Sequence, residues 1–274
     1  MSENETRFKL TLHYDGSAFH GWQVQPGQPT VQGALEAVIS RITGEHRTVT
    51  GAGRTDTGVH ATGQVAAVTV PGKWTSRTLV RALNSLLPRG VWVQGATRTD
   101  PGFQPRFDAV ARSYSYRVGT VPEAASPFHR RWCWPLGRAL DLEAASRTAE
   151  SIRGEHEFHA FAKAGQSHRG HRCRVTKARW QPWGELGAVF EITANRFLHR
   201  MVRYLVGTMV DIALGRRKEE DMVLLLGDSE PLPGDSALTT SPPAPPEGLF
   251  LTGVEYPATA RGDSVVNQTL HYVI

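Results

Sequence analysis

Segments of alternating polar and apolar residues, interleaved with amphipathic helical segments, constrain the fold of this chain more than any other feature of its sequence. In residues 7–14 the apolar side chains of Phe8, Leu10 and Leu12 fall on one side, which predicts a β-strand. A helical run follows, beginning at Thr30 and carrying its apolar residues near one face. The start of the chain therefore has the strand-then-helix order of a mixed fold.

The same two patterns recur along the chain. They predict further strands at residues 46–51, 64–70, 91–96, 109–118, 175–183, 188–193 and 249–256. They predict further helices at residues 75–87, 140–152 and 196–214, and an extended loop in the proline-rich segment 230–247. We expect an α+β (α/β sandwich-like) fold of two domains, 1–105 and 106–274. Each would be a largely antiparallel sheet with helices on one side, and the cleft between them is the natural place for a site.

A glycine-rich segment at residues 51–60, GAGRTDTGVH, presents Arg54 and Asp56 on a short, tight loop after a predicted strand. Glycine adopts backbone angles that other residues resist and lets a ligand approach the main chain. The guanidinium of Arg54, two residues away, favours the ionised form of the Asp56 carboxyl group. An ionised carboxylate in a pocket can attack an electrophilic carbon, as retaining glycosidases do at a sugar's anomeric carbon. The segment therefore suggests a nucleophilic role for Asp56.

Three other interpretations fit parts of this segment. Asp56 can simply bond to the backbone of its own turn, as aspartate often does. The tripeptide DTG is that of aspartic proteases, but its single copy would require a symmetric dimer, and Arg54 opposes the shared proton that such a dyad needs. The GxG at the start resembles part of a dinucleotide fingerprint, but no glycine stands three residues on and the loop leads into a strand. The nucleophile and the simple turn both remain open on this local pattern.

Two tyrosines follow in the predicted strand at 109–118. Alternation places Tyr114 and Tyr116 on one face of the strand and Arg117 on the other. A tyrosine beside RNA can stack on a flipped base, or its hydroxyl can move a proton. Ordinary packing within a sheet explains either residue equally well when it is taken alone.

A basic group marks the start of the predicted helix 196–214. On a helix, Arg196, His199, Arg200 and Arg203 would fall within an arc of roughly 100°. Cations at a helix N-terminus oppose the helix dipole, and a nearby carboxylate or phosphate would offset that cost. The group is therefore either a solvated face or the neighbour of an anion.

Histidines and one cysteine gather between residues 156 and 173. The residue types suit a metal, but the pair HEFH is one residue short of the two-histidine zinc signature and the chain has no CxxC. We expect no metal ligands here and instead exposed histidines on an RNA-facing loop. The group comprises His156, His159, His168, His171 and Cys173.

The charge of the chain points to a polyanionic partner. The formal net charge is +5 and the pI about 9.5, and only 5 of the 31 basic residues are lysines. Guanidinium groups match phosphate oxygens in pairs and stack on bases, although a general bias toward arginine would give the same count. We expect a cytoplasmic protein, because no apolar run is long enough for a membrane span and two cysteines suggest reduced thiols.

Taken together, these segments closely resemble the tRNA pseudouridine synthase A family. The matching motifs keep the family's order from near residue 7 to near residue 257, and the ordered set is far more specific than any one of them. They are YDGSxFxGWQ (14–23), TVQGALE (30–36), GRTDxGVHA (53–61), GQV (63–65), ARxYxY (111–116), GEHEF (154–158), FxHxMVR (197–203) and EGLFL (247–251).

The resemblance implies a homodimeric synthase that isomerises uridine to pseudouridine in the tRNA anticodon stem-loop, at the expected positions 38, 39 and 40, without a cofactor. It implies that Asp56 is the catalytic aspartate, Tyr114 the active-site tyrosine and Arg203 the basic partner of the aspartate. Its further implication is a substrate-binding set of Arg54, Tyr114, Leu249, His60, Arg196 and Arg200. A non-catalytic RNA-binding module would explain the basic charge and the tyrosines, but not the loop that carries Asp56.

Overall fold

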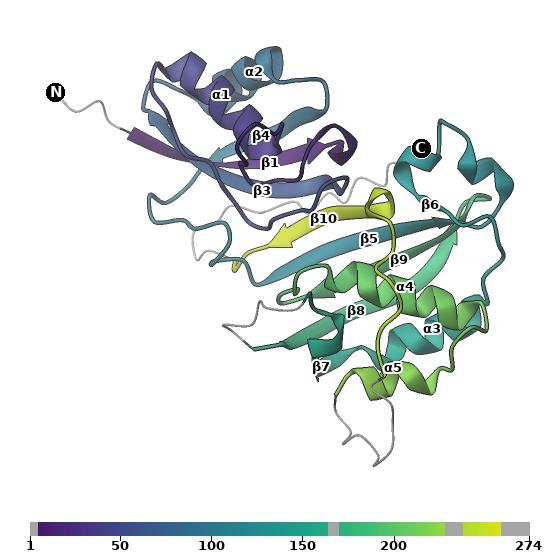
Figure 1. Cartoon of the computed structure of the whole chain (residues 1–274). Helices are drawn as coiled ribbons and strands as arrows, with labels where there is room; N and C mark the ends of the chain where they lie inside the picture. The colour runs from purple at the N-terminus through teal and green to yellow at the C-terminus, as the bar shows by residue number, and fades with distance from the viewer. Residues whose placement is uncertain (1–4, 164–169, 228–237, 259–274) are drawn as a thin grey trace.

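One mixed β-sheet forms the centre of the molecule (Figure 1). The computed structural model describes residues 5–163, 170–227 and 238–258. The strands run in the order β4-β1-β3-β10-β5-β9-β8-β7, with β2 paired to β3 and β6 paired to β5. Their bounds are β1 Glu5–Tyr14, β2 Thr50–Gly51, β3 His60–Pro71, β4 Val91–Arg98, β5 Ala111–Gly119, β6 Trp134–Pro135, β7 Gly154–Glu157, β8 Arg172–Trp183, β9 Gly187–Ala194 and β10 Leu249–Glu255.

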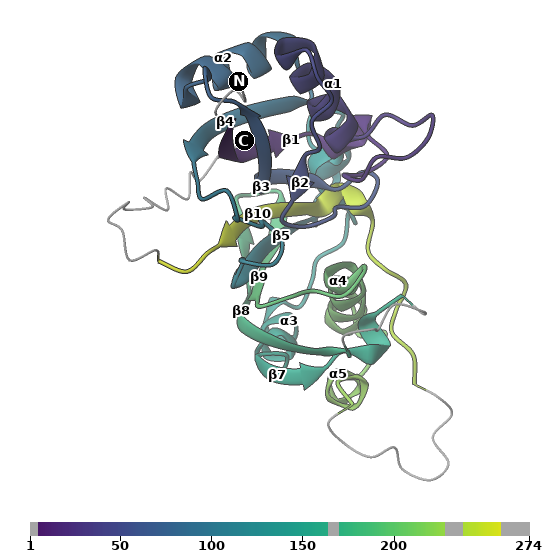
Figure 2. The ribbon, with the colours of Figure 1, turned by 90° about the vertical axis from the view of Figure 1, so that its left-hand side faces the viewer.

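Five α-helices of the described residues pack against this sheet, so the predicted α+β class is confirmed. In two views, α1 and α2 lie against the N-terminal strands, and α3, α4 and α5 lie against the C-terminal strands (Figures 1 and 2). None of these helices is long and apolar enough to cross a membrane. Their bounds are α1 Val31–Thr43, α2 Ser76–Leu86, α3 Leu142–Ser151, α4 Met201–Ala213 and α5 Glu220–Leu225.

The late strand β10 joins the two halves of the sheet. It pairs in parallel with β3 and antiparallel with β5, so the sheet runs from one half into the other without a break. Leu251 on this strand belongs to the apolar cluster of the N-terminal strands, whereas Leu249 belongs to the cluster of the C-terminal strands. Each half thus has its own core, and β10 contributes to both.

Several elements form where the pattern predicts them. Along β1 every second side chain from Phe8 to Tyr14 is buried, as its alternation requires. Helix α1 begins after Thr30, whose side chain accepts a hydrogen bond from the backbone N–H of Gly33, and ends at Gly44 in the left-handed conformation. Helix α2 has a capping box between Thr75 and Thr78 and stops before Pro88.

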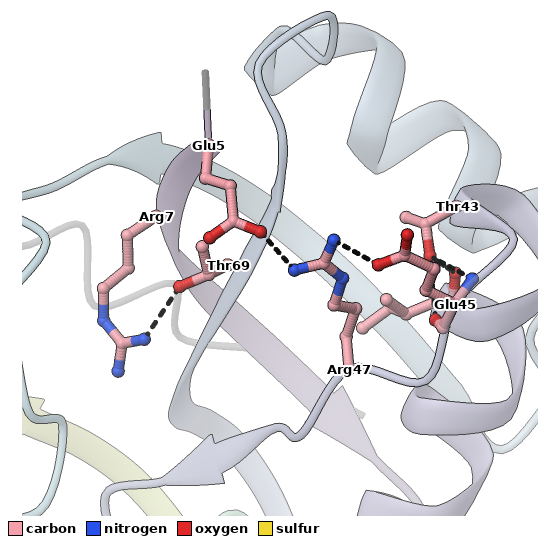
Figure 3. A network of polar contacts seen from close by, with 7 residues as sticks. Glu5, Arg7, Thr43, Glu45, Arg47 and Thr69 are labelled. Atoms are coloured by element: carbon pink, nitrogen blue, oxygen red, sulfur yellow. Dashed lines mark hydrogen bonds and ion pairs between the residues drawn. The ribbon is translucent and has the colours of Figure 1, made fainter. Parts of the chain in front are cut away.

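The strand predicted at residues 46–51 is wrong for most of its length, because β2 contains only Thr50 and Gly51. Side chains hold the preceding backbone instead of a neighbouring strand. The backbone N–H of Val49 donates to the Glu36 carboxylate at 2.9 Å, and Arg47 forms ion pairs with Glu5 and Glu45 (Figure 3). Residues 46–49 therefore have the alternating pattern of a strand, but polar side-chain contacts take the place of sheet hydrogen bonds there.

The helix predicted to begin at residue 196 begins instead at Met201. Residues 198–201 form a turn, closed by a 3.1 Å bond from the Met201 N–H to the Leu198 carbonyl. Arg200 has a φ of 63°, the left-handed conformation, which cannot continue a right-handed helix. The prediction that the four basic residues lie on one helix is therefore wrong: Arg196, His199 and Arg200 precede α4, and only Arg203 lies on it.

Three further segments complete the comparison with the sequence patterns. Strand β7 and helix α5 were not predicted, because each is short: β7 has 4 residues and α5 has 6. The described part of the proline-rich segment, from residue 238, is extended as expected up to a short 3-10 turn at Pro246–Gly248. Its residues 230–237 lie outside the described part of the chain.

The left-handed Arg200 leads to a prediction about stability. Glycine adopts positive φ without a steric cost, whereas alanine keeps the cost of roughly 1 kcal/mol. We expect Arg200→Gly to be about 1 kcal/mol more stable than Arg200→Ala in urea unfolding, although both lose the guanidinium. Equal stability of the two variants would show that the turn relaxes to another conformation.

Candidate active site

The loop that carries Asp56 lies between β2 and β3 and is closed by its own backbone. The Val59 N–H donates to the Asp56 carbonyl at 3.1 Å, which makes a four-residue turn. Gly58, at the third position of this turn, has a φ of 80° and lets the turn close without a side-chain clash. The Asp56 side chain is 25% exposed, so it is accessible without being fully hydrated.

Buried groups of the N-terminal half brace this loop from below. The backbone N–H of Trp22 donates to the Thr55 carbonyl at 3.0 Å, and the Tyr14 hydroxyl lies 2.8 Å from the Thr55 hydroxyl. The side-chain amide of Gln64, which is fully buried, donates to the Gly53 carbonyl at 2.9 Å. A Cβ on Gly21 would lie 2.6 Å from the Thr55 carbonyl oxygen, so only glycine permits this close approach. The loop is therefore firmly supported on the N-terminal side of Asp56.

Three side chains from the β9–α4 connection and the start of α4 face the Asp56 carboxylate. The Nε2 atom of His199 lies 3.1 Å from Oδ1. A nitrogen of Arg203 lies 3.4 Å and the Nε of Arg200 lies 3.7 Å from Oδ2. The sequence predicted either a solvated basic face or a nearby anion at this helix start. The structure shows the anion, which is the Asp56 carboxylate.

The end of the proline-rich segment orients Arg203. Its Nε donates to the Ala244 carbonyl at 2.6 Å, and the Ala244 N–H donates back to the Arg203 carbonyl at 2.9 Å. The Tyr116 hydroxyl donates to the next carbonyl, that of Pro245, at 2.6 Å. The segment 242–246, here called the strap, crosses α4 on its way to β10 (Figure 1). Its bond to the Nε of Arg203 leaves another guanidinium nitrogen facing Asp56.

Tyr114 on β5 lies beside the same loop. A Cβ on Gly53 would be 3.9 Å from its hydroxyl, and its ring packs edge-on against Phe197 with centroids 5.0 Å apart. Burial raises the pKa of Tyr114 to about 12, with Arg112 lowering it and the charge of Asp56 raising it further. The hydroxyl is therefore neutral at physiological pH.

The remaining predicted site residues differ in their surroundings. Arg54 is exposed and has no hydrogen-bond or ion-pair partner in the described part of the chain, so the charges near Asp56 come from α4 and its turn. Arg196 donates to the Gly170 carbonyl at 3.3 Å. Leu249, 6% exposed, packs in the core of the C-terminal half.

His60 lies under the loop and not at its surface. It is 1% exposed, its Nδ1 accepts from the Gly16 N–H at 3.0 Å, and its Nε2 faces the Arg131 carbonyl at 3.1 Å. Its ring stacks on Phe250 with centroids 4.8 Å apart. Both ring nitrogens thus have protein partners, and the predicted substrate contact of His60 is corrected to a structural role.

One residue of this site was absent from the set predicted to act on substrate. His199 contacts Asp56 directly, yet the sequence placed it only among the basic residues of a helix. The motif FxHxMVR at residues 197–203 contains His199, four residues before Arg203, and could have identified it.

The members of the histidine and cysteine group lie in two pairs: the His159 and His171 rings have centroids 6.4 Å apart, and His156 pairs with Cys173 across β7 and β8. Within the described ranges, no three His, Cys, Asp or Glu side chains come together as a metal site would need. His156 faces the Arg153 carbonyl at 2.8 Å, and Cys173 is buried. His168 lies outside the described residues.

Comparison with known proteins gives a single, consistent match. The family model described as tRNA pseudouridine synthase matches residues 11–108 and 148–257. The chain is 39% identical over 251 residues to tRNA pseudouridine synthase A of Methylacidiphilum infernorum, covering 91% of this chain and 95% of that protein. It is 38% identical over 265 residues to tRNA pseudouridine synthase A of Limosilactobacillus fermentum, covering 94% and 99%. For tRNA pseudouridine synthase A of Neisseria gonorrhoeae the identity is 38% over 258 residues, with 92% of each chain covered.

The two ranges matched by the family model contain the loop of Asp56 and the start of α4, whereas the strand of Tyr114 lies between them. They favour neither a protease nor a dinucleotide-binding protein. With the geometry around Asp56, they show that this chain belongs to the tRNA pseudouridine synthase family.

Proposed function

We propose that this protein isomerises uridine to pseudouridine in tRNA, with Asp56 as the nucleophile. The observation that carries the proposal is the arrangement of Asp56 itself, a partly exposed carboxylate on a braced turn with His199, Arg200 and Arg203 around it. A uridine must leave the helical stack before a protein can reach its glycosidic bond. The partly exposed carboxylate is accessible to such a flipped nucleotide.

The chemistry balances as an isomerisation. An oxygen of Asp56 attacks either the anomeric carbon of the ribose or the uracil ring, and the bond between the anomeric carbon and N1 breaks. The uracil turns, its carbon 5 bonds to the anomeric carbon, the hydrogen on carbon 5 leaves as a proton, and N1 takes up a proton from solvent. The carboxylate is released unchanged. No atom is gained or lost, in keeping with the absence of a cofactor that the family resemblance implies.

Tyr114 is proposed to assist the final proton removal. Its raised pKa makes an ionised phenolate scarce at neutral pH, so the neutral hydroxyl must relay the proton. Phe197 and the loop at Gly53 hold the ring in place. Leu249 would form part of the apolar wall of the site behind these groups.

Arginines near the site are proposed to bind the RNA. Arg54 is exposed beside Asp56, which suits a role in displacing the target base from the anticodon stem-loop. Arg196 and Arg200 lie on the connection between β9 and α4, and the net charge of +5 supports binding to phosphates. The expected targets remain the uridines at positions 38, 39 and 40.

The larger organisation is also part of the proposal. Residues 1–105 and 106–274 would act as two domains, since each part has its own apolar cluster and the groups around Asp56 come from both. A cleft at their junction would receive the flipped base. A homodimer follows from the family resemblance, and two buried free cysteines suit a cytoplasmic location.

The reaction predicts release of tritium from tRNA labelled at uridine carbon 5. We expect the wild-type protein to release it and Asp56→Ala to lose release by roughly four orders of magnitude or more, because the nucleophile is gone. As a control, Asp56→Asn should bind tRNA about as tightly as the wild type in a filter-binding assay. Tight binding without any release by the wild type would leave a non-catalytic RNA-binding module.

The state of Tyr114 predicts the pH dependence of the reaction. If the neutral hydroxyl is the active form, kcat stays level between about pH 8 and 10, because the pKa of Tyr114 lies near 12. Tyr114→Phe should lower kcat by roughly 10²- to 10⁴-fold across this range. A tenfold rise in the wild-type kcat with each pH unit would instead assign the reaction to the phenolate.

A further inference from the structure

We infer that His199 is a positioning residue that fixes the orientation of the Asp56 carboxylate. The inference rests on the proposed nucleophilic role of Asp56. The Nε2 of His199 and Oδ1 of Asp56 are 3.1 Å apart, and the two side chains are similarly shielded, at 28% and 25% exposed. This contact is on the oxygen that the arginines do not contact.

The surroundings define where the proton of His199 lies. The Asp56 carboxylate can only accept, so Nε2 carries the hydrogen. The Nδ1 atom is buried and has no hydrogen-bond partner. A hydrogen on Nδ1 would be a buried N–H without a partner, which is unfavourable. His199 therefore donates from Nε2 to Asp56.

Two points of contact are what a carboxylate needs to be held in one plane. The torsion that rotates an aspartate carboxylate is soft and broad, so contact on one oxygen leaves the other free to swing. Arg203 and Arg200 hold Oδ2 at 3.4 and 3.7 Å, and His199 holds Oδ1. Without His199 the carboxylate would rotate about its bond while still attracted to the arginines. The attacking oxygen would then spend less time in line with its target.

The backbone around His199 is built to keep the imidazole in place. The His199 carbonyl accepts from the Lys163 N–H at 3.3 Å, and the next bond of the turn joins Met201 to Leu198 at 3.1 Å. Arg200 keeps its left-handed φ of 63° at the same turn. A turn held in an unfavourable conformation beside the nucleophile is more consistent with a positioning role than with a solvated histidine.

The test compares His199→Ala with His199→Gln, whose side-chain amide can again donate to Asp56. We expect the alanine variant to lose about 10- to 100-fold in kcat for tritium release, with the dissociation constant for the tRNA within about twofold of wild type. The glutamine variant should recover most of the lost kcat. His46→Ala, which removes a histidine 71% exposed at the other end of the N-terminal half, is the matched control and should be unaffected.

A second measurement observes the wild-type protein itself and uses a variant only to assign the signal. Nitrogen-15 NMR of the histidines in the wild-type protein, assigned by comparison with His199→Gln, should show His199 with its hydrogen on Nε2 at neutral pH. An Nε2 atom without a hydrogen would overturn the inference.

Other outcomes also decide the question. Unchanged kcat in a folded His199→Ala variant, a loss of tRNA binding as large as the loss of kcat, or a glutamine variant no better than alanine would each overturn it. Asp56→Ala, assayed in parallel, separates the two proposals. If that variant is active, the proposed nucleophile fails; if it is inactive while His199→Ala is fully active, only the role of His199 fails.

Discussion

The electrostatic contact between Asp56 and the cationic start of α4 is the interaction on which the rest of this structure depends. Its partners, His199 and Arg203, stand 143 and 147 residues further along the chain. A loop in one half and a helix start in the other must therefore meet within hydrogen-bonding distance. The continuous sheet provides this, because β10 fixes β3 beside β5, and the strap at Ala244 fixes Arg203 on its helix.

Much of the fold follows from local patterns, and its errors have local causes. The strand β1 and the helix α1 could be predicted because burial and capping in those segments agree with intrinsic preference. Residues 46–51 and 196–200 could not, because long-range polar contacts to Glu36 and Asp56 determine their backbone. The position of β10 was also beyond the sequence, since pairing order depends on contacts between remote segments.

The site was predictable in its residue types more than in its contacts. Asp56 and Arg203 could be named from the motifs, and the structure places them together. Arg54, only two residues away in sequence, is exposed instead and forms no ion pair with Asp56 in the described part of the chain. His60 is buried, and its ring completes the packing beneath the loop. Residues near Asp56 in the sequence are therefore not the ones that contact its carboxylate.

The central place of β10 has a consequence for how the protein is made. The strand occupies residues 249–255, yet it fills the gap between β3 and β5, which are synthesised much earlier. On the ribosome, both neighbours wait with an unpaired edge until almost the whole chain has emerged. Those exposed edges are natural targets for chaperones, and a message truncated before this point encodes a protein without a joined sheet.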